Sequence, residues 1–198
     1  MIIAIVASGP SVEGVDLRPL HSAHVIAVNF AVTWAPVVHS FFSLDPSPSI
    51  LMLLQQRHRR EGVKYHLAVP HDWRGTHRDG IQYLRRISGD GVRGASRGLS
   101  EDVSSIHTGN SAFGALGLAY HMRPRKILLL GVDATDNGYA YNKGSPNWSL
   151  GHLPDLFATA CDQLRERNIS IVNGSPRSLV TCFTRMDPQS GITWLLQE

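Results

Sequence analysis

The chain is dominated by short apolar runs, each of which ends abruptly in turn-forming or polar residues. The first run, IIAIVA at residues 2–7, is continuous rather than alternating, which is typical of a strand buried on both faces. The sequence therefore predicts up to six buried strands. The other five runs occupy residues 25–28, 37–44, 65–69, 127–130 and 169–172.

Helices are expected between and after these strands, at residues 49–61, 79–87, 110–121, 153–167 and 176–184. Alternating strands and helices favour a mostly parallel sheet with helices on both faces and right-handed crossovers. A chain of 198 residues is the size of one α/β domain and can bury about 70% of its unfolded surface. We therefore predict an α/β fold, a single Rossmann-like domain over residues 1–198.

Two irregular segments interrupt the alternation. Residues 88–98 contain four glycines without periodicity, which predicts a mobile loop. Residues 136–151 are longer than an ordinary connection, and loops of this length in compact domains are usually functional or disordered. We predict that residues 136–152 form a lid over a ligand.

Charge and composition argue against a nucleic-acid-binding protein and against a membrane-spanning protein. The net charge of +3 is modest, and the basic clusters at 57–60 and 123–126 have no interleaved aromatic residues. They are interpreted as solvated faces, and no nucleic-acid partner is expected. The apolar start at residues 2–7 is too short to span a membrane. Cys161 and Cys182 lack metal or framework spacing and are interpreted as thiols in a reducing, cytoplasmic compartment.

The residues that follow the apolar runs are the candidates for a binding site, because ligands of open parallel sheets bind outside the carboxyl ends of the strands. Glycines let the backbone approach a phosphate, and a helix that begins near Thr108 presents unpaired amides and a positive dipole end to an anion. The nucleotide-binding candidates are Ser8, Gly9, Pro10, Ser11, Asn29, Asp45, Ser47, Thr108, Gly109, Asn110, Gly131, Asp133 and Thr135.

These residues also have an architectural interpretation. Thr108 or Asn110 can cap the following helix, while Gly114 and Gly117 permit close packing on the sheet. Asp133 can orient either its own loop or a ribose. The loop after the first apolar run, SGPS, lacks the three spaced glycines of the dinucleotide-binding fingerprint, and the sequence contains no GKS or GKT phosphate loop, so NAD chemistry and P-loop chemistry are disfavoured.

Several short motifs occur in a fixed order over nearly the whole chain. They are SGPS at 8–11, VN at 28–29, DPS at 45–47, TG at 108–109, GVD at 131–133, GYAY at 138–141, GH at 151–152 and SPRSL at 175–179. In these motifs the chain resembles the bacterial CMP-sialic-acid-dependent sialyltransferases of glycosyltransferase family 42. Its glycine-proline-serine opening is also similar to that of 6-hydroxymethylpterin diphosphokinase-like proteins of archaea, bacteria and phages.

The sialyltransferase resemblance implies a glycosyltransferase-A-like variant of the fold and a metal-independent enzyme. Such an enzyme would transfer a glycosyl group from a nucleotide sugar, CMP-linked in the family, to an unknown acceptor. Family members often assemble as homo-oligomers, so the resemblance also implies a homo-oligomer.

The resemblance assigns roles by position. Asn29 matches a nucleotide-contacting asparagine, whereas Ser8 and Asp45 stand where the family has asparagines. Thr108 and Gly109 match a serine-glycine pair that lies along the cytidine monophosphate.

The catalytic candidates come from the same resemblance. Tyr139 or Tyr141 matches one of two tyrosines that stabilise the leaving phosphate, and Thr135 stands at the position of the other. His152 matches the proposed general base. These roles suit the side chains, since a histidine can accept a proton near neutral pH and phenols can stabilise a departing phosphate without a metal.

Two other functions remain open. A Mg²⁺-dependent diphosphokinase would use carboxylates such as Asp133 with Asp136, and would bring Asp45 and Asp133 together at a cation. A nucleotide-binding module without turnover is the second, because two amides and one tyrosine of the family pattern are replaced.

Other metal-binding or ring-stacking side chains give weaker signals. His66, His71 and His77 are spaced too widely for a zinc site. Trp34 and Trp148 are interpreted as packing residues, although Trp148 could stack on a ligand from the lid.

Overall fold

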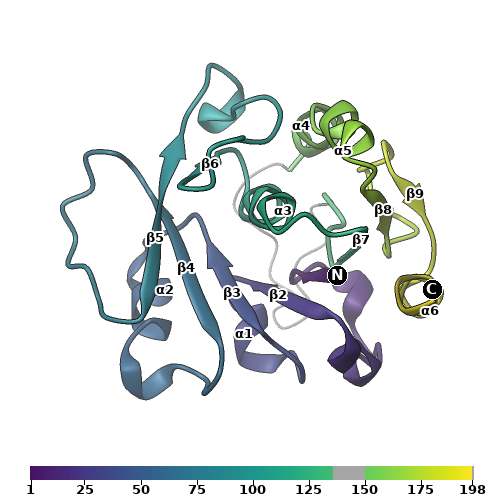
Figure 1. Ribbon diagram of the computed structural model, residues 1–198, viewed down its shortest axis with the longest axis horizontal. Coiled ribbons are helices and arrows are strands. Elements are labelled where there is room, and N and C mark those ends of the chain that lie inside the picture. The colour runs from purple at the N-terminus through teal and green to yellow at the C-terminus, as the bar shows by residue number, and fades with distance from the viewer. Residues whose placement is uncertain (136–149, 198) are drawn as a thin grey trace.

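The fold is one parallel sheet covered by helices on both faces (Figure 1). A computed structural model describes residues 1–135 and 150–197 of the chain. Within these ranges nine strands, all parallel, are ordered β6-β5-β4-β3-β2-β1-β7-β8-β9. The α/β class and the Rossmann-like layout are therefore confirmed.

The bounds of the elements are as follows. The strands are β1 (Ile2–Val6), β2 (His24–Val28), β3 (Ser40–Ser43), β4 (Lys64–Val69), β5 (Ile81–Ile87), β6 (Ser105–His107), β7 (Lys126–Leu130), β8 (Ser170–Asn173) and β9 (Thr184–Arg185). The α-helices are α1 (Ala31–Trp34), α2 (Pro48–Leu53), α3 (Ser111–His121), α4 (Leu153–Ala158), α5 (Cys161–Glu166) and α6 (Pro188–Leu196). Short 3₁₀ turns are η1 (Pro10–Val12), η2 (Arg18–Ser22), η3 (Gln56–His58) and η4 (Val92–Gly94).

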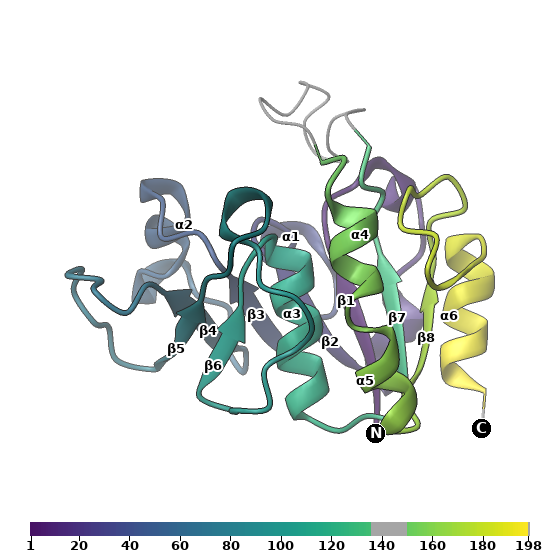
Figure 2. The same ribbon diagram turned by 90° about the horizontal axis from the view of Figure 1, so that it is seen from above.

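The order of the strands reverses beside β1. After β1 the chain adds β2 to β6 on one side, then returns through α3 and places β7 on the other side. β1 and β7 pair directly, from Ile2 opposite Lys126 to Val6 opposite Leu130. The loops that follow them lie at the same edge of the sheet (Figure 2). In doubly wound sheets such a reversal opens a crevice between the loops, which is where ligands bind.

Two hydrophobic clusters hold the layers together. Ile3 and Ile5 of β1 join the cluster of α3, α4 and α5, whereas the intervening Ala4 joins the cluster of α1, α2 and α6. Figure 1 shows these two sets of helices on opposite faces of the sheet. Because successive side chains of a strand point to opposite faces, a continuous apolar run serves both clusters, as the sequence predicts.

The prediction of a helix over 79–87 is wrong, since these residues form the strand β5. It pairs with β4, from Tyr65 opposite Ile81 to Val69 opposite Arg85, and with β6 on its other side. Its buried Ile81 and Leu84 are three residues apart, which imitates a helical face. Pairing with two neighbouring strands overrides this local pattern.

The expected helix at 176–184 is also absent, and this segment is a hydrogen-bonded loop. Ser178 Oγ donates to the carbonyl of Val132 at 2.7 Å, and the amide of Leu179 donates to the carbonyl of Asp133 at 3.0 Å. The helix of this region is α6 instead. Its cap is readable in the sequence, because Asp187 precedes Pro188 and accepts from the amide of Ser190 at 2.9 Å.

The remaining helical predictions hold in part. The segment 110–121 is α3, 153–167 is split into α4 and α5, and 49–61 contains α2 and η3. The segment 88–98 is irregular except for η4, as expected, and Ser96 Oγ ties it to the carbonyl of Ile87 at 2.8 Å. The mobility of this loop stays a prediction.

The basic cluster at 57–60 is not simply a solvated face. Arg60 Nη1 donates to the carbonyls of Val32 at 3.2 Å and Ala35 at 2.6 Å, and Nη2 donates to Pro36 at 3.1 Å. Arg60 thereby closes the carboxyl end of α1. Among the helices of the described ranges, none has the length and apolar content needed to cross a bilayer.

Candidate functional site

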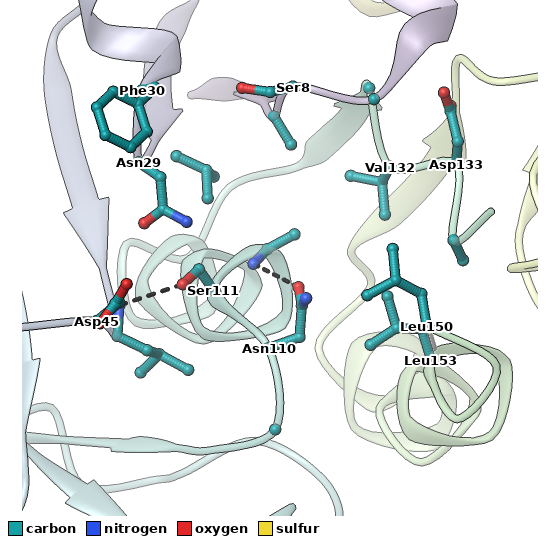
Figure 3. A pocket seen from close by; sticks show the side chains of 18 of the residues that line it. Ser8, Asn29, Phe30, Asp45, Asn110, Ser111, Val132, Asp133, Leu150 and Leu153 are labelled. Carbon is teal, nitrogen blue, oxygen red and sulfur yellow. Dashed lines mark hydrogen bonds between the residues drawn. The ribbon is translucent and has the colours of Figure 1, made fainter. Parts of the chain in front are cut away.

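A cavity of about 580 Å³ lies at the reversal between β1 and β7 (Figure 3). This volume is typical of pockets for small ligands. Its walls are the loops after β1, β2, β3 and β7, the first turn of α3 and the start of α4. The site candidates that line it are Ser8, Gly9, Pro10, Asn29, Asp45, Gly109, Asn110, Gly131, Asp133, Thr135 and His152. We call this cavity the strand-tip pocket.

Three predicted site residues that the structure describes are not on its wall. Ser11, Ser47 and Thr108 are described but do not line the pocket. Tyr139 and Tyr141 lie outside the described residues, as do Asp136, Trp148 and most of the predicted lid. A second hollow, of about 670 Å³, lies open on the surface at Gln55, Gln56 and Arg57 and shares no lining residue with the strand-tip pocket.

Gly9 and Gly131 allow the β1 and β7 loops to touch. The amide of Gly9 donates to the carbonyl of Gly131 at 2.9 Å. A Cβ on Gly9 would lie 2.5 Å from that carbonyl oxygen, and one on Gly131 would meet the carbonyl oxygen of Ala7. Gly131 also has a φ of +69°, a region that favours glycine. Both glycines line the pocket, but close backbone packing alone already requires them.

Asp133 orients its own loop. Its carboxylate accepts from the amide of Ser11 at 2.8 Å and from Ser11 Oγ at 2.5 Å, and the hydroxyls of Ser11 and Ser175 are 2.5 Å apart. The residue is 8% exposed. Of the two interpretations from sequence, the geometry therefore favours loop orientation, and Ser11 belongs to this network rather than to the pocket wall.

Ser8 and Asn29 present polar atoms that no described residue satisfies. Ser8 Oγ and Asn29 Oδ1 are buried, and neither has a hydrogen-bond partner in the described ranges. Asn29 has a φ of 53°, a conformation that asparagine tolerates better than most residues. Leaving a buried polar group unpaired costs about 1–3 kcal/mol, so such groups indicate a water or a ligand. Figure 3 shows both side chains on the wall of the pocket.

The first turn of α3 forms the pocket floor. Asn110 Oδ1 accepts from the amide of Ala112 at 2.7 Å, so Asn110 is the cap. Thr108 is not a cap, because it is buried and its hydroxyl donates to the carbonyl of Gly94. Gly114 packs against the ring of Phe42, as the architectural interpretation expects. The first amides of a helix have no intrahelical partners, so those of this turn that the Asn110 cap does not satisfy are donors for an anion.

Asp45 and Asp133 do not converge. Asp45 Oδ1 accepts from the amide of Ser47 at 3.0 Å, and the side chain lies on the opposite side of the pocket from Asp133 (Figure 3). The described residues contain no group of three or more histidine, cysteine or carboxylate side chains that could hold a metal ion. The convergence of Asp45 and Asp133 that a diphosphokinase would need is therefore absent, whereas the pair of Asp133 with Asp136 is not tested, because Asp136 lies outside the described residues.

Two arginines on the wall were not indicated by the sequence. Arg86 lies near the carboxyl end of β5, and Arg93 lies in η4. Because the sequence predicts a helix over 79–87 and a mobile loop over 88–98, neither arginine counts as a strand tip. Identifying 81–87 as a strand would have placed Arg86 at the carboxyl edge of the sheet, together with the other candidates.

Arg86 is only partly satisfied by the protein. Its Nη1 donates to the carbonyl of Leu44 at 3.2 Å, whereas its Nε is buried without a partner in the described part of the chain. Burial lowers the pKa of Arg86 below the usual arginine value, and the nearby Asp45 carboxylate opposes this shift. The Arg86 guanidinium thus lies in the pocket wall with at least one donor, Nε, that no described residue satisfies.

His152 lies at the start of α4, on the pocket wall. Its Nε2 is 3.4 Å from the carbonyl oxygen of Gly109. When Nε2 carries the proton and donates to this carbonyl, Nδ1 is the unprotonated nitrogen. Leu150 and Leu153 lie beside it on the same wall and make this end of the pocket apolar.

The remaining candidates for metal binding or ring stacking, His66, His71, His77 and Trp34, do not line the pocket. His66 is 5% exposed, and burial together with His24 and Lys64 lowers its pKa to about 4. His77 stacks on Tyr83 with ring centres 4.2 Å apart, while His71 is exposed. Trp34 packs against the hydrophobic cluster of α1, α2 and α6, as expected.

Comparison of the chain with protein-family models, with curated proteins and with solved structures finds no match. Function therefore has to be inferred from the chemistry of the strand-tip pocket.

Proposed function

We propose that the protein is a glycosyltransferase-like enzyme that binds a nucleotide sugar in the strand-tip pocket. His152 would act as the general base on an acceptor hydroxyl. The observation that carries the proposal is the pair of buried, unpartnered atoms, Ser8 Oγ and Asn29 Oδ1, on a pocket at the reversal of a parallel sheet.

The two sides of the pocket suit the two parts of such a ligand. Polar groups of Ser8, Asn29 and Asp45 line the side near β2 and β3, where ribose and base hydrogen bonds can form. The first turn of α3 is suited to phosphate. His152 lies toward α4, beside Leu150 and Leu153, where the transferred group and the acceptor would meet.

The proposed reaction needs one proton acceptor and one stabilised leaving group. The acceptor hydroxyl gives its proton to the unprotonated nitrogen of His152, and its oxygen forms a bond to the anomeric carbon. The bond from that carbon to the phosphate oxygen breaks, and its electron pair stays on the phosphate. The amides of the first turn of α3 then stabilise the added negative charge. Tyr139 or Tyr141 stays a proposed donor to the same phosphate.

Binding is tested by titration calorimetry with CMP-, UDP- and GDP-sugars. We expect the wild-type protein to bind at least one of them, and Ser8→Ala to weaken that binding about 2- to 10-fold. Ser8→Ala should not lower the Tm, because Ser8 Oγ makes no hydrogen bond to the described residues and an unpaired buried hydroxyl does not stabilise the fold. Ser22→Ala, at an exposed serine of η2, is the control and should change neither quantity. Absence of binding at millimolar concentrations of every nucleotide sugar would overturn the proposal.

Catalysis is tested with His152→Asn. We expect this variant to bind the nucleotide sugar normally and to lose at least about 100-fold in donor hydrolysis or transfer. If the wild-type protein binds the donor but neither hydrolyses it nor transfers its sugar to any acceptor of a panel, the enzymatic part of the proposal fails and the inactive binding module takes its place.

A further inference from the structure

Arg86 and the first turn of α3 approach the pocket on two sides of one residue. Arg86 Nη1 donates to the carbonyl of Leu44 at 3.2 Å, and the amide of the same Leu44 donates to Ser111 Oγ at 3.3 Å. Ser111 is the first residue of α3. Figure 3 shows Ser111 joined by this bond to the chain that carries Asp45. The guanidinium and the helix N-terminus are therefore two neighbouring sets of donors, separated by the width of one residue.

The guanidinium of Arg86 has a buried donor for which the described residues supply no acceptor. Nε is buried without a partner among the described residues, although an unpaired charged donor is costly to bury. Asp45 lies near enough to influence Arg86 but is not within salt-bridge distance of it, and its Oδ1 already accepts from the amide of Ser47. A planar guanidinium with free donors matches the oxygens of a phosphate or carboxylate.

We infer that Arg86 and the first turn of α3 together form a subsite for a diphosphate. The ligand of the strand-tip pocket is then a nucleoside diphosphate sugar rather than a nucleoside monophosphate sugar. One phosphate lies against the amides of α3, and the other accepts from the Nε and Nη groups of Arg86. The choice of donor rests on the proposed function, whereas the diphosphate subsite does not.

The neighbouring arginine provides a matched control. Arg85 is on the same strand, but its guanidinium is half exposed and pairs with Asp102 at 3.2 Å, away from the pocket. Arg85→Met removes the same charge from the same strand. Arg86→Met removes the guanidinium with its charge, and Arg86→Lys keeps the charge without the bidentate geometry. Circular dichroism and the Tm of each variant establish that it is folded.

The experiment measures the affinities of the wild type and these variants for UMP, UDP, GMP, GDP and inorganic pyrophosphate. Of UDP and GDP, we expect the one that the wild type binds more tightly to bind at least about 10-fold more tightly than the corresponding monophosphate. Arg86→Met should weaken diphosphate and pyrophosphate binding about 10- to 100-fold, with much less effect on the monophosphates. The diphosphate affinity of Arg86→Lys should lie between those of the wild type and Arg86→Met. Arg85→Met should have the affinities of the wild type.

Three outcomes separate this inference from the proposed function. Equal affinity for monophosphates and diphosphates, or diphosphate binding that is unchanged in folded Arg86→Met and Arg86→Lys, overturns the diphosphate subsite and leaves nucleotide binding intact. Pyrophosphate binding that depends on Arg86, without binding of these nucleotides or of the CMP-, UDP- and GDP-sugars, supports the subsite and overturns the proposed function. Absence of binding of all five probes to the wild type overturns the diphosphate subsite, and it overturns the proposed function as well only when the CMP-, UDP- and GDP-sugars also fail to bind.

Discussion

Replacing Asp133 should destabilise the whole domain, because this carboxylate holds the β1 loop against the β7 loop. In Asp133→Ala the amide and hydroxyl of Ser11 both lose a charged acceptor in a site that is 8% exposed. Hydrogen bonds to charged groups contribute about 1.5–3 kcal/mol each, and Ser11 is partly exposed, so we expect a loss of about 2–4 kcal/mol. For a domain of this size that corresponds to a fall in Tm of about 4–16 °C.

The assay is urea unfolding followed by far-ultraviolet circular dichroism, with thermal melting as a second measurement. Asp45→Ala is the control, because Asp45 is exposed and its side chain accepts one bond from the described residues, donated by the amide of Ser47. It should cost less than about 1 kcal/mol. A folded Asp133→Ala protein with wild-type stability and lost nucleotide affinity would refute the structural role and make Asp133 a ligand-binding residue.

Two other residues give independent predictions of stability. His66 has a folded pKa of about 4 against 6.5 in the unfolded chain, so the unfolded state binds more protons between these values. Stability should therefore fall by about 3 kcal/mol as the pH is lowered from 6.5 to 4, and urea titrations should show a much smaller slope in His66→Gln. Arg60→Met should cost about 2–3 kcal/mol in the same titrations, because three carbonyls at the end of α1 lose their donor. The exposed Arg57→Met should cost almost nothing, and equal losses would refute the capping role.

The sequence predicted which residues line the pocket where the preceding strand has a clear apolar run. Ser8, Asn29 and Gly131 follow continuous apolar runs, and Asp45 follows the mostly apolar run at 37–44. Parallel strands bring their carboxyl ends to one edge of the sheet. No knowledge of the contacts was needed, because the positions follow from the strand pattern and the direction of the chain.

Arg86 was missed because β5 lacks such a run. Its buried Ile81 and Leu84 have helical spacing, and only pairing with β4 and β6 makes the segment a strand. A pairing partner distant in sequence leaves no local trace, so the arginine at the end of this strand was missed as well.

Asp133 shows the second limit of sequence reasoning. A carboxylate after a strand can bind a ligand or orient a loop, and the sequence alone left both open. The choice depends on Ser11, which is 122 residues away in the chain and donates two hydrogen bonds to this carboxylate. By contrast, the cap at Asn110 and Ala112 is local, and residue type and spacing were enough to suggest it.

The most direct test of a phosphate-binding pocket at the strand tips is a crystal structure of the protein with UDP or GDP bound. The predicted result is a nucleotide between the β1 and β7 loops, with its phosphates against the first turn of α3 and Arg86, and with Ser8 Oγ and Asn29 Oδ1 hydrogen-bonded to it. A nucleotide bound elsewhere on the protein, with Ser8 and Asn29 still unpartnered in the pocket, would contradict the assignment.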